Sequence, residues 1–490
     1  MTFSLHLSVS RLAARPAISA SAAISVIALF GLALRVVFST GPLVNDEVWS
    51  LANLRGISAF WRVLWGISHD NNHFLNSLWL YFVWPWSHDP IWLRLPSILA
   101  GAFAIPLMAQ LGGRHGPAGA LAASLLTALS FFQITFSVEA RGYSTAALGL
   151  ILAYGAIERA LDDPASGARW RLAAGAGLAF FSHLAAGVAL AFFALIALGE
   201  AIRRGRGMIG SFRSTFRMFW PAALAMIPTL MFVVAGYREM GGFTIGFYNA
   251  FGAGHLFSAI VNLEMDTLGL NPGRLPEIAF AVIVLPLAIV AAIVRLAPPE
   301  RRIAYVAMLL GLPVAVLACR LPNTNAARYF FALSPFLLLL FADSSAAGWR
   351  QGGAARAIAV LALAAFTFGS GAALARRYAG EREPWTHALE RISRSGDLAI
   401  ASSFDFNVGR TVAFYNGTQT APLELVPRAR LCERRPGWYV SELPTNDPAA
   451  AAVSLAGEGC EIRYALVGSY SRYTPGQPHW GLYRRADLVE

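Results

Sequence analysis

Lysine is absent from the sequence: all 39 basic residues are arginine, set against 28 acidic residues. Charge is scarce overall, because charged residues fill only 14% of the 490 positions and hydrophobic residues fill 56%. A chain this apolar does not have the composition of a soluble protein. The lack of lysine also means that any site for phosphate must use arginine or histidine, or the help of a metal ion.

The sequence contains many long apolar segments. Runs of about 18–22 residues recur, and each is long enough to cross a bilayer as a helix. Since backbone groups in lipid must pair within the protein, we predict a helical integral membrane protein. We expect about eleven membrane helices, at residues 17–38, 95–112, 117–135, 143–160, 172–182, 185–202, 218–236, 277–296, 303–319, 329–347 and 356–375. The first has no signal-peptide cleavage site after it, so we interpret it as a membrane anchor.

The net charge of +11 is distributed unevenly between the two sides of this predicted membrane domain. When the N-terminus is placed in the cytoplasm, arginines are several-fold denser in the inner loops than in the longer outer loops, as the positive-inside rule requires. We therefore attribute the surplus of positive charge to membrane orientation and expect no nucleic-acid partner.

Two apolar segments need separate interpretation. Residues 172–199 could form one long helix, but both flanks are rich in arginine, so we predict a hairpin with His183 near its outer tip. Residues 74–86 are apolar and aromatic but short, and we predict an interfacial or half-inserted helix. The first outer loop then runs from about residue 39 to residue 94.

The last segment, residues 376–490, lacks long apolar runs and carries 14 arginines and 13 acidic residues. Residues 397–403 and 463–470 are predicted as strands and residues 384–392 as a helix, which indicates a small α/β domain outside the membrane. The chain has only three cysteines, of which Cys432 and Cys460 lie in this domain. A disulfide between them would stabilise the domain by roughly 3–4 kcal/mol; two unpaired thiols are the alternative.

Two adjacent carboxylates, Asp46 and Glu47, follow the first predicted span. Asp46 is ionised at neutral pH and could act as a general base. Its neighbour Glu47 would then raise the pKa and the basicity of Asp46 by repulsion between like charges. The alternative is a solvated acidic loop, which is ordinary just outside a membrane.

Polar residues from four further segments are expected at the same outer face. Residues 68–77 hold His69, Asn72 and His73, which suit sugar hydroxyls or a phosphate better than zinc, because no cysteine and no HExxH motif accompany them. The other members of the set are Glu139, Arg141, Tyr143, His183, Arg328 and Tyr329. Each could be a simple anchor or a snorkelling side chain. All of these residues are expected on the outer face of the membrane. This favours a functional site, because residues that only anchor the protein would be distributed over both faces.

The order of these motifs resembles the GT-C superfamily of membrane glycosyltransferases, and most closely glycosyltransferase family 39. That family includes protein O-mannosyltransferases and the aminoarabinose transferase that acts on lipid A. The resemblance covers residues ~15–400. It rests on the Asp-Glu pair and on the segments HDNNHFLNSLWLYF, LRLPSILAGAFAIPLMAQLGGRHG, SVEARGYS, FSHLA, ARYFFALSPF and PWTHALERISRSGDLAI. The chain departs from the family's HPPL motif in lacking both prolines, and from the aminoarabinose branch in lacking a lysine.

The resemblance implies an all-α GT-C membrane domain at residues 1–375 and a periplasmic α/β domain at residues 376–490. It implies an inverting glycosyltransferase of the bacterial inner membrane, with its N-terminus in the cytoplasm. A sugar would pass from a polyprenyl-phosphate donor to a lipid, glycan or protein acceptor on the periplasmic side, with membrane lipid around the protein. Asp46 would be the catalytic base, Glu47 would assist it, and the remaining polar set would bind the donor phosphate. A cofactor is not certain, and a divalent cation, Mg²⁺ or Mn²⁺, stays open.

Three alternatives remain at the level of the sequence. A transporter or flippase of lipid-linked glycans would place charges near the middle of the bilayer and often shows internal repeats; no clear repeat is present, and Asp343 near an inner helix end is the exception among the carboxylates. A structural subunit of an envelope complex would make the acidic pair incidental. A GT-C polymerase or ligase would use a diphosphate-linked donor.

Overall fold

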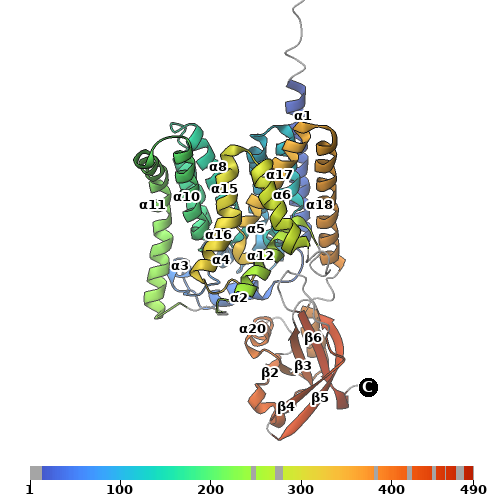
Figure 1. Ribbon diagram of the computed structural model, residues 1–490. Coiled ribbons are helices and arrows are strands. Elements are labelled where there is room, and N and C mark those ends of the chain that lie inside the picture. Colours follow the sequence, from blue (N-terminus) through green and yellow to red (C-terminus); the bar gives the residue numbers. More distant parts are fainter. Residues whose placement is uncertain are drawn as a thin grey trace, which may run out of the picture.

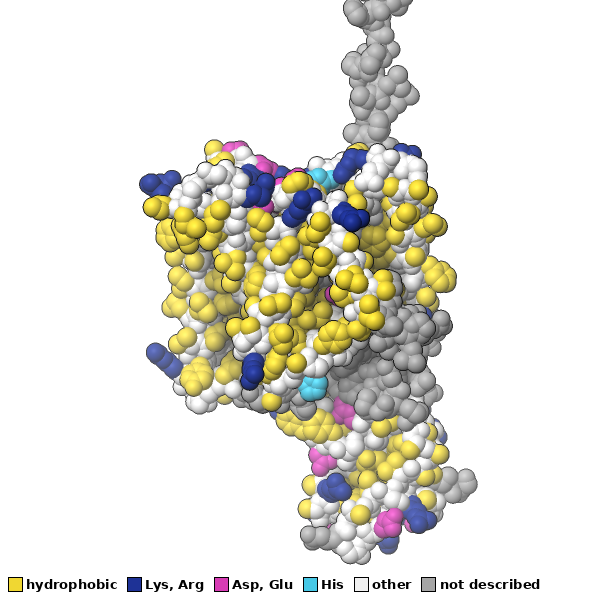
Figure 2. Space-filling view, in the orientation of Figure 1, with side chains coloured by type: hydrophobic (Ala, Val, Ile, Leu, Met, Phe, Trp, Pro, Cys, Tyr) yellow, Lys and Arg dark blue, Asp and Glu magenta, His cyan; other side chains and the backbone are white. Residues whose placement is uncertain are grey.

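The computed structural model describes residues 14–243, 250–270, 280–379, 385–416, 422–443, 449–457, 459–470 and 479–488. Long helices pack together in a bundle, and a β-sheet domain lies beyond one end of it (Figure 1). The described chain begins at the opposite end, at the top of α1 in Figure 1. Hydrophobic side chains cover the middle of the bundle, and basic side chains gather mainly along its upper edge (Figure 2).

Helices form at all eleven places where apolar runs predict them, although residues 277–279 of one prediction lie outside the described residues. Their bounds are α1 (Ala14–Phe38), α5 (Pro90–Gly113), α6 (Pro117–Leu129) with α7 (Phe131–Ser137), α8 (Tyr143–Asp162), α9 (Ala168–Ser182), α10 (Ala186–Arg203), α11 (Met208–Met240), α14 (Leu285–Arg295), α15 (Arg302–Tyr305) with α16 (Leu312–Cys319), α17 (Leu333–Gln351) and α18 (Gly353–Ala379). By length and composition, 7 described helices can cross a membrane, or up to 8 if α6 and α7 count as one span. The chain is therefore a multi-pass membrane protein. The number of such helices is lower than the expected eleven or so membrane helices, because α9, α14 and α17 are too short or not apolar enough to count as spans.

The span at residues 117–135 is broken at Ser130, where α6 and α7 meet at an angle of 55°. A helix end leaves backbone carbonyls without partners. The buried side chain of Arg35 from α1 fills this need, because its guanidinium donates to the carbonyls of Thr127 (3.2 Å) and Ala128 (3.3 Å). Arg35 thus holds the bend that directs α7 toward the loop at residues 138–142.

The predicted hairpin at residues 172–199 is confirmed, because α9 ends at Ser182 and α10 starts at Ala186. The predicted short helix also forms, as α4 (Phe74–Val83). Two helices of the first outer loop, α2 (Asn45–Leu54) and α3 (Arg62–Trp65), and the later α12 (Ala253–Leu268) were not predicted. The helices α2, α4 and α12 lie at the lower end of the bundle, toward the sheet (Figure 1).

The C-terminal domain is the predicted α/β unit. Its strands are β1 (Ala399–Ser402), β2 (Glu424–Leu425), β3 (Trp438–Leu443), β4 (Ala452–Gly457), β5 (Cys460–Tyr470) and β6 (His479–Arg485), in the sheet order β2-β1-β3-β6-β5-β4. Its main helices are α19 (Trp385–Arg394) and α20 (Asp405–Tyr415). Cys432 and Cys460 form a disulfide, which decides between the two alternatives left open by the sequence.

Helix α20 fixes this domain onto α2 of the membrane domain. Arg55 donates to the carbonyl of Phe414 (3.1 Å), one of the last carbonyls of α20. The guanidinium of Arg410 lies 4.2 Å from the ring centre of Trp49 and 4.5 Å from that of Phe406. A shared hydrophobic cluster joins the two helices as well. The sheet domain is therefore attached to the same short helix that begins with the acidic pair.

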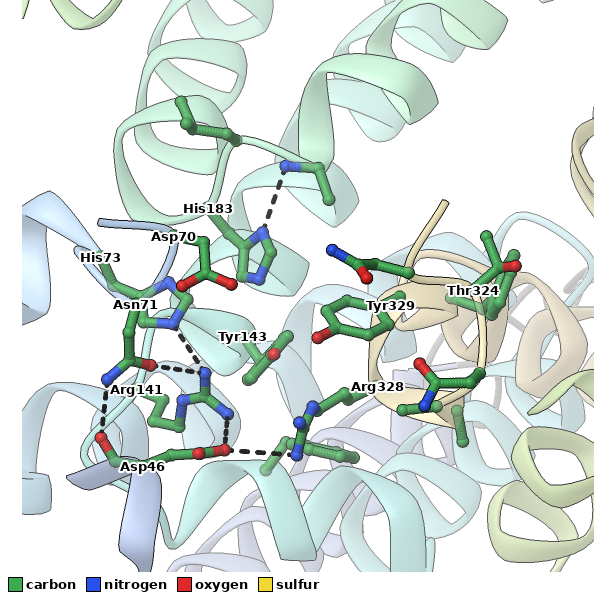
Figure 3. Close-up of a pocket in the computed structure, with 18 of the residues that line it drawn as sticks. Asp46, Asp70, Asn71, His73, Arg141, Tyr143, His183, Thr324, Arg328 and Tyr329 are labelled. Atoms are coloured by element: carbon green, nitrogen blue, oxygen red, sulfur yellow. Dashed lines mark hydrogen bonds and ion pairs between the residues drawn. The ribbon is translucent and has the colours of Figure 1, made fainter. Parts of the chain in front are cut away.

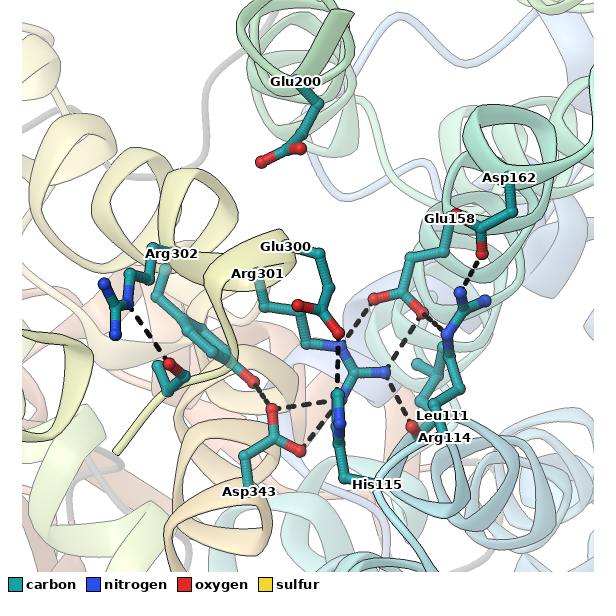
Figure 4. A network of polar contacts seen from close by, with 12 residues as sticks. Leu111, Arg114, His115, Glu158, Asp162, Glu200, Glu300, Arg301, Arg302 and Asp343 are labelled. Carbon is teal, nitrogen blue, oxygen red and sulfur yellow. Dashed lines mark hydrogen bonds and ion pairs between the residues drawn. The ribbon is translucent and has the colours of Figure 1, made fainter. Parts of the chain in front are cut away.

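A buried ionic network holds the opposite end of the bundle together (Figure 4). Arg301 has no exposed surface and donates to Glu158 (2.6 Å), to Asp343 (2.9 Å) and to the carbonyl of Leu111 (2.7 Å). Tyr305 also donates to Asp343. Buried charges need such pairing, because an uncompensated charge in the interior is costly. Asp343, the carboxylate noted as an exception when a transporter was considered, is thus part of a structural ion pair.

Candidate active site

A cavity of ≈ 1030 Å³ lies at the lower end of the bundle and reaches the sheet domain. Most of the predicted polar set lines it, together with neighbouring residues (Figure 3). Its polar lining from the membrane domain includes Asn45, Asp46, Asp70, Asn71, Asn72, His73, Arg141, Tyr143, His183, Asn262, Asp266, Arg328 and Tyr329. The convergence of distant segments predicted from the sequence is thus present in the fold.

Asp46 stands in the first turn of α2, with its side chain 22% exposed toward this cavity. Arg141 Nη1 donates to Asp46 Oδ2 at 2.6 Å, and Arg328 Nη1 lies 3.2 Å from the same oxygen. The two guanidinium groups approach the carboxylate from two sides (Figure 3). Asn71 Nδ2 donates to the backbone carbonyl of Asp46 at 2.8 Å, which fixes the start of the helix. Asp46 is therefore the carboxylate on which the site converges.

Glu47, unlike the adjacent Asp46, does not face the cavity. Its side chain is fully buried, and Arg94 donates to both of its oxygens at 2.8 Å. The same oxygens accept from the backbone N–H groups of Val44 and Ala140, each at 2.5 Å. The bond to Val44 caps α2, and the bond to Ala140 ties the helix to the loop that carries Arg141. The structure therefore corrects the expectation that Glu47 acts beside Asp46 in the cavity: it is a positioning residue, and Arg94 neutralises the charge that was expected to raise the pKa of Asp46.

Arg141 is held rigidly in the loop between α7 and α8. It donates from Nη2 to Asn71 Oδ1 (2.8 Å) and contacts His73 Nε2 (3.3 Å), and its guanidinium lies 4.9 Å from the ring centre of Tyr143. Burial lowers the pKa of Arg141, but Asp46 and the neighbouring Tyr143 and Glu139 together outweigh burial, so the pKa of Arg141 is raised. Arg141 is thus a fixed positive charge at the floor of the cavity.

Arg328 is more accessible than Arg141. It lies in a short helical turn, η4 (Ala327–Phe330), and its side chain is 25% exposed, against 7% for Arg141. Its Nε atom has no hydrogen-bond partner among the described residues. The guanidinium lies 5.5 Å from the ring centre of Tyr329, and Asp46 raises the pKa of Arg328 against the effect of burial. Arg328 therefore keeps its charge and retains donors for a further anion.

Two histidines form the upper wall of the site, beside Tyr143. The rings of His73 and His183 are 4.8 Å apart, and the ring of Tyr143 lies 4.6 Å from that of His183. Burial lowers the pKa of His183 to about 3, with the charges of Arg141 and Arg328 adding to the effect. His183 Nδ1 accepts from the N–H of Ala185 (3.2 Å), so the neutral ring carries its proton on Nε2. These histidines are hydrogen-bonding groups and not cations.

Of the remaining residues predicted from the sequence, some line the cavity and others lie outside it. Asn72 lines the cavity, but its Nδ2 donates to the carbonyls of Val63 and Ile67, so it also shapes the loop. Glu139 is only 2% exposed and lies outside the cavity lining. His69 and His73 both precede α4, which begins at Phe74, and His69 Nδ1 lies 2.8 Å from Asp70 Oδ1.

Several lining residues escaped the sequence prediction. Asn71 and Asp70 lie within the polar stretch at residues 68–77, which could have signalled them. Asp266, only 6% exposed, comes from α12, and Glu442 comes from β3 of the C-terminal domain. Nothing in the local sequence separates these two carboxylates from ordinary outer-loop residues.

One side of the cavity is apolar. It is lined by residues that include Phe132, Phe136, Leu184, Val188, Leu312, Val316 and Leu333. These side chains come from α7, the α9–α10 hairpin, α16 and α17. A charged cluster next to such a wall suits a ligand with a charged head and a hydrocarbon tail.

The sequence left open whether the site binds a divalent cation, which would need a group of ligating side chains. Among the described residues, no group of three or more His, Cys, Asp or Glu side chains is placed to hold a metal ion. The carboxylate of Asp46 is occupied by two arginines. Arg141 and Arg328 place two positive charges beside this carboxylate.

The fold is shared with a solved membrane protein. The crystal structure of ArnT from Cupriavidus metallidurans bound to undecaprenyl phosphate matches with a TM-score of 0.54, covering 86% of this chain and 93% of that chain at 13% sequence identity. The chain therefore has the predicted GT-C fold. The cryo-EM structure of the arabinosyltransferase EmbB from Mycobacterium smegmatis has a TM-score of 0.32 at 16% identity, covers 77% of this chain and 44% of that chain, and supports no further argument. No protein-family model and no curated protein sequence matches the chain.

Proposed function

We propose that the protein is an inverting glycosyltransferase that moves a sugar from a polyprenyl-phosphate donor to an acceptor hydroxyl. The observation that carries the proposal is the convergence of Arg141 and Arg328 on Asp46, in a cavity with an apolar wall at the helix ends. A polyprenyl tail would lie along the apolar wall and keep the phosphate at the membrane surface. The bound undecaprenyl phosphate in ArnT, which shares the fold, supports the same class of ligand.

The reaction follows from the chemistry of the donor. The acceptor oxygen attacks the anomeric carbon, and the bond between that carbon and the phosphate oxygen breaks, so that the electron pair leaves with polyprenyl phosphate. The acceptor hydroxyl gives its proton to Asp46, the general base. Attack from the face opposite the phosphate inverts the anomeric centre. The leaving phosphate gains negative charge, which a positioned guanidinium stabilises more effectively than water does.

Arg328 has a specific part in this scheme. Without donor, it shares the Oδ2 atom of Asp46 with Arg141, at the longer of the two distances (3.2 against 2.6 Å). A donor phosphate would offer it a bidentate partner, which a planar guanidinium prefers. Phosphate binding would thus draw Arg328 away from Asp46 and leave that carboxylate freer to accept a proton.

A diphosphate-linked donor is the second candidate, because two guanidinium groups lie within reach of one anionic group. The two donor classes separate in a binding test with purified protein. We expect undecaprenyl phosphate to bind, Arg328→Ala to weaken binding at least about tenfold, and Arg328→Lys to restore it only in part, as expected for loss of a charge-assisted pair. The matched control is Arg238→Ala, an exposed arginine at the end of α11. Equal binding by all of these proteins, or binding of undecaprenyl diphosphate alone, contradicts the polyprenyl-phosphate proposal.

The proposed location is the bacterial inner membrane, with the site and the C-terminal domain on the periplasmic face. Basic side chains gather at the end of the bundle opposite to that domain (Figure 2). The positive-inside rule assigns that end to the cytoplasm. The disulfide between Cys432 and Cys460 also suits an oxidising compartment. A lipid-linked donor sugar would then be used outside the cytoplasm, next to envelope acceptors.

A further inference from the structure

The C-terminal domain supplies one wall of the cavity. Phe404, Phe406, Asn407 and Glu442 line it, although they lie far along the chain from the other lining residues. Phe404 directly precedes α20, Phe406 and Asn407 lie in its first turn, and Glu442 lies near the end of β3. The site is therefore built by both domains, and this wall has no part in the donor chemistry described above.

The polar half of this wall presents hydrogen-bond acceptors. Asn407 Nδ2 donates to both oxygens of Glu442, at 3.2 and 3.3 Å. The amide donor is thus turned toward the carboxylate, and the amide oxygen of Asn407 has no donor to it among the described residues. A surface of amide and carboxyl oxygens matches a ligand rich in hydroxyl donors.

The other half of the wall is aromatic. The ring of Phe406 meets Trp49 edge to face at 5.1 Å and lies 6.1 Å from Phe404, while Arg410 covers Trp49 and Phe406 on another side. Phe406 remains 42% exposed, which is unusual for a phenylalanine inside such a cluster. The exposed ring of Phe406 beside hydrogen-bonding groups suits the mixed apolar and hydroxyl surface of a sugar ring, whereas Trp49 is only 9% exposed and supports Phe406 by its edge-to-face contact.

The wall is poorly suited to an extended peptide. Peptides that bind to sheets usually add a strand to an open edge. Glu442 lies near the end of β3, where it pairs with Trp480 of β6, and its backbone N–H donates to Ser403 Oγ (2.7 Å) just beyond the end of β1. The backbone beside this wall is therefore already paired, and recognition must come from the side chains.

The wall adjoins the proposed base. Trp49 follows Asp46 by three residues on α2, so the two side chains lie about one turn apart on the same side of the helix. A ligand on Phe406 would therefore lie beside the turn of α2 that carries Asp46. This is where an acceptor hydroxyl must be delivered.

We propose that Trp49, Phe406, Asn407 and Glu442 form the acceptor subsite, and that the acceptor is an uncharged sugar unit of a glycan rather than a peptide hydroxyl. This inference rests on the proposed transfer reaction. The sugar unit could belong to a soluble glycan or to one carried on a lipid. Both sources present the same hydroxyl-rich ring to the wall.

The test uses the full-length protein in lipid nanodiscs. Its probes are fluorescently tagged neutral disaccharides, the same disaccharides on an alkyl chain, and a tagged serine- and threonine-rich peptide. We expect the sugar probes to bind and the peptide not to bind. Tighter binding of the alkyl form than of the free form assigns the sugar to a lipid-linked glycan, and equal binding assigns it to a soluble one.

Two variants test whether the sugar probes bind at the wall formed by the C-terminal domain. Glu442→Gln keeps the shape, and we expect it and Phe406→Ala to weaken sugar binding about tenfold, the size of one hydrogen bond or buried contact. The matched control is Glu461→Gln, an exposed carboxylate on β5 of the same sheet. Undecaprenyl phosphate binding, measured on the same preparations, should stay within about twofold of wild type.

The outcomes separate the two proposals. If undecaprenyl phosphate binds and Arg328→Ala weakens it, but sugar probes bind the wall variants as well as wild type, the acceptor subsite is wrong and the transfer proposal stands. Binding of the peptide in preference to the sugars also overturns the acceptor inference. If undecaprenyl phosphate does not bind at all, the transfer proposal itself fails.

Discussion

Asp46 and Glu47 are consecutive residues, yet their carboxylates bind different arginines in different surroundings. Asp46 faces the cavity and pairs with Arg141, whereas Glu47 is buried and pairs with Arg94. Successive residues of a helix point about 100° apart, so one turn of α2 can serve both purposes. One carboxylate is left for chemistry because the other holds the helix that presents it.

The first prediction separates these two roles by stability. Glu47→Gln leaves the charge of Arg94 buried and unpaired, and we expect it to lower the free energy of unfolding by about 3–5 kcal/mol. Asp46→Asn should change stability less, since its side chain is 22% exposed and Arg141 keeps its hydrogen bond to Asn71 Oδ1. Thermal unfolding in detergent compares the two variants. Equal melting temperatures would contradict the division of roles.

The second prediction concerns divalent cations. We expect chelation of Mg²⁺ and Mn²⁺ to leave transfer unchanged, because Arg141 and Arg328 provide the positive charge for the leaving phosphate. The measurement is the transfer rate with a chelator and again after either metal is restored. In Arg328→Ala, added metal should not rescue the rate. A rate that collapses on chelation and returns with metal would assign the charge to an ion instead.

The third prediction is a pH dependence from Glu442. Burial raises the pKa of Glu442 from 4.5 to about 7, with the hydrogen bond from Asn407 acting weakly in the opposite direction. The folded state therefore binds this proton more tightly than the unfolded state. This contribution to stability is fully present below about pH 4.5 and is lost as the pH rises through about 7.

Glu442→Gln should remove that dependence, because an amide does not titrate in this range. Melting temperatures at pH 5 and pH 8 are compared for wild type, Glu442→Gln and the control Glu461→Gln. The difference between the two pH values should shrink in Glu442→Gln alone. An unchanged difference would mean that Glu442 ionises as an ordinary carboxylate.

The fourth prediction is the membrane orientation. A reporter enzyme that is active only outside the cytoplasm, fused after Glu490, should be active in cells. A reporter fused within the loop between α10 and α11, where arginines cluster at residues 203–206, should be inactive. The reverse pattern would place the site on the cytoplasmic face and would leave a periplasmic glycosyltransferase untenable.

The features that the sequence predicts well depend on local pattern. The eleven helices follow from long apolar runs, the α9–α10 hairpin from its arginine flanks, and the C-terminal domain from the change in composition after residue 375. Helix α12 was missed because a 16-residue helix with Asn262, Glu264 and Asp266 does not resemble a span. Its place against the cavity is a matter of tertiary packing.

The features that the sequence does not predict depend on contacts between distant residues. Nothing near Glu47 indicates that Arg94 will neutralise it, so the acidic pair was interpreted as one functional unit. Likewise Glu442 lies nearly 400 residues after Asp46, and only the docking of α20 on α2 brings the C-terminal wall to the site. Local sequence patterns predict which polar residues lie at the outer membrane face. They do not predict which of those residues line the cavity and which only hold other residues in position.

The most direct test of the central claim is sugar transfer by Asp46→Asn. This substitution keeps the shape of the side chain and removes the proton acceptor. With a polyprenyl-phosphate sugar as donor, we expect turnover to fall by ~10²–10⁴, the usual contribution of a general base. Undecaprenyl phosphate should bind the variant as tightly as wild type or more tightly, because the amide no longer competes for Arg141 and Arg328. Wild-type turnover by Asp46→Asn, with donor binding intact, would contradict the account.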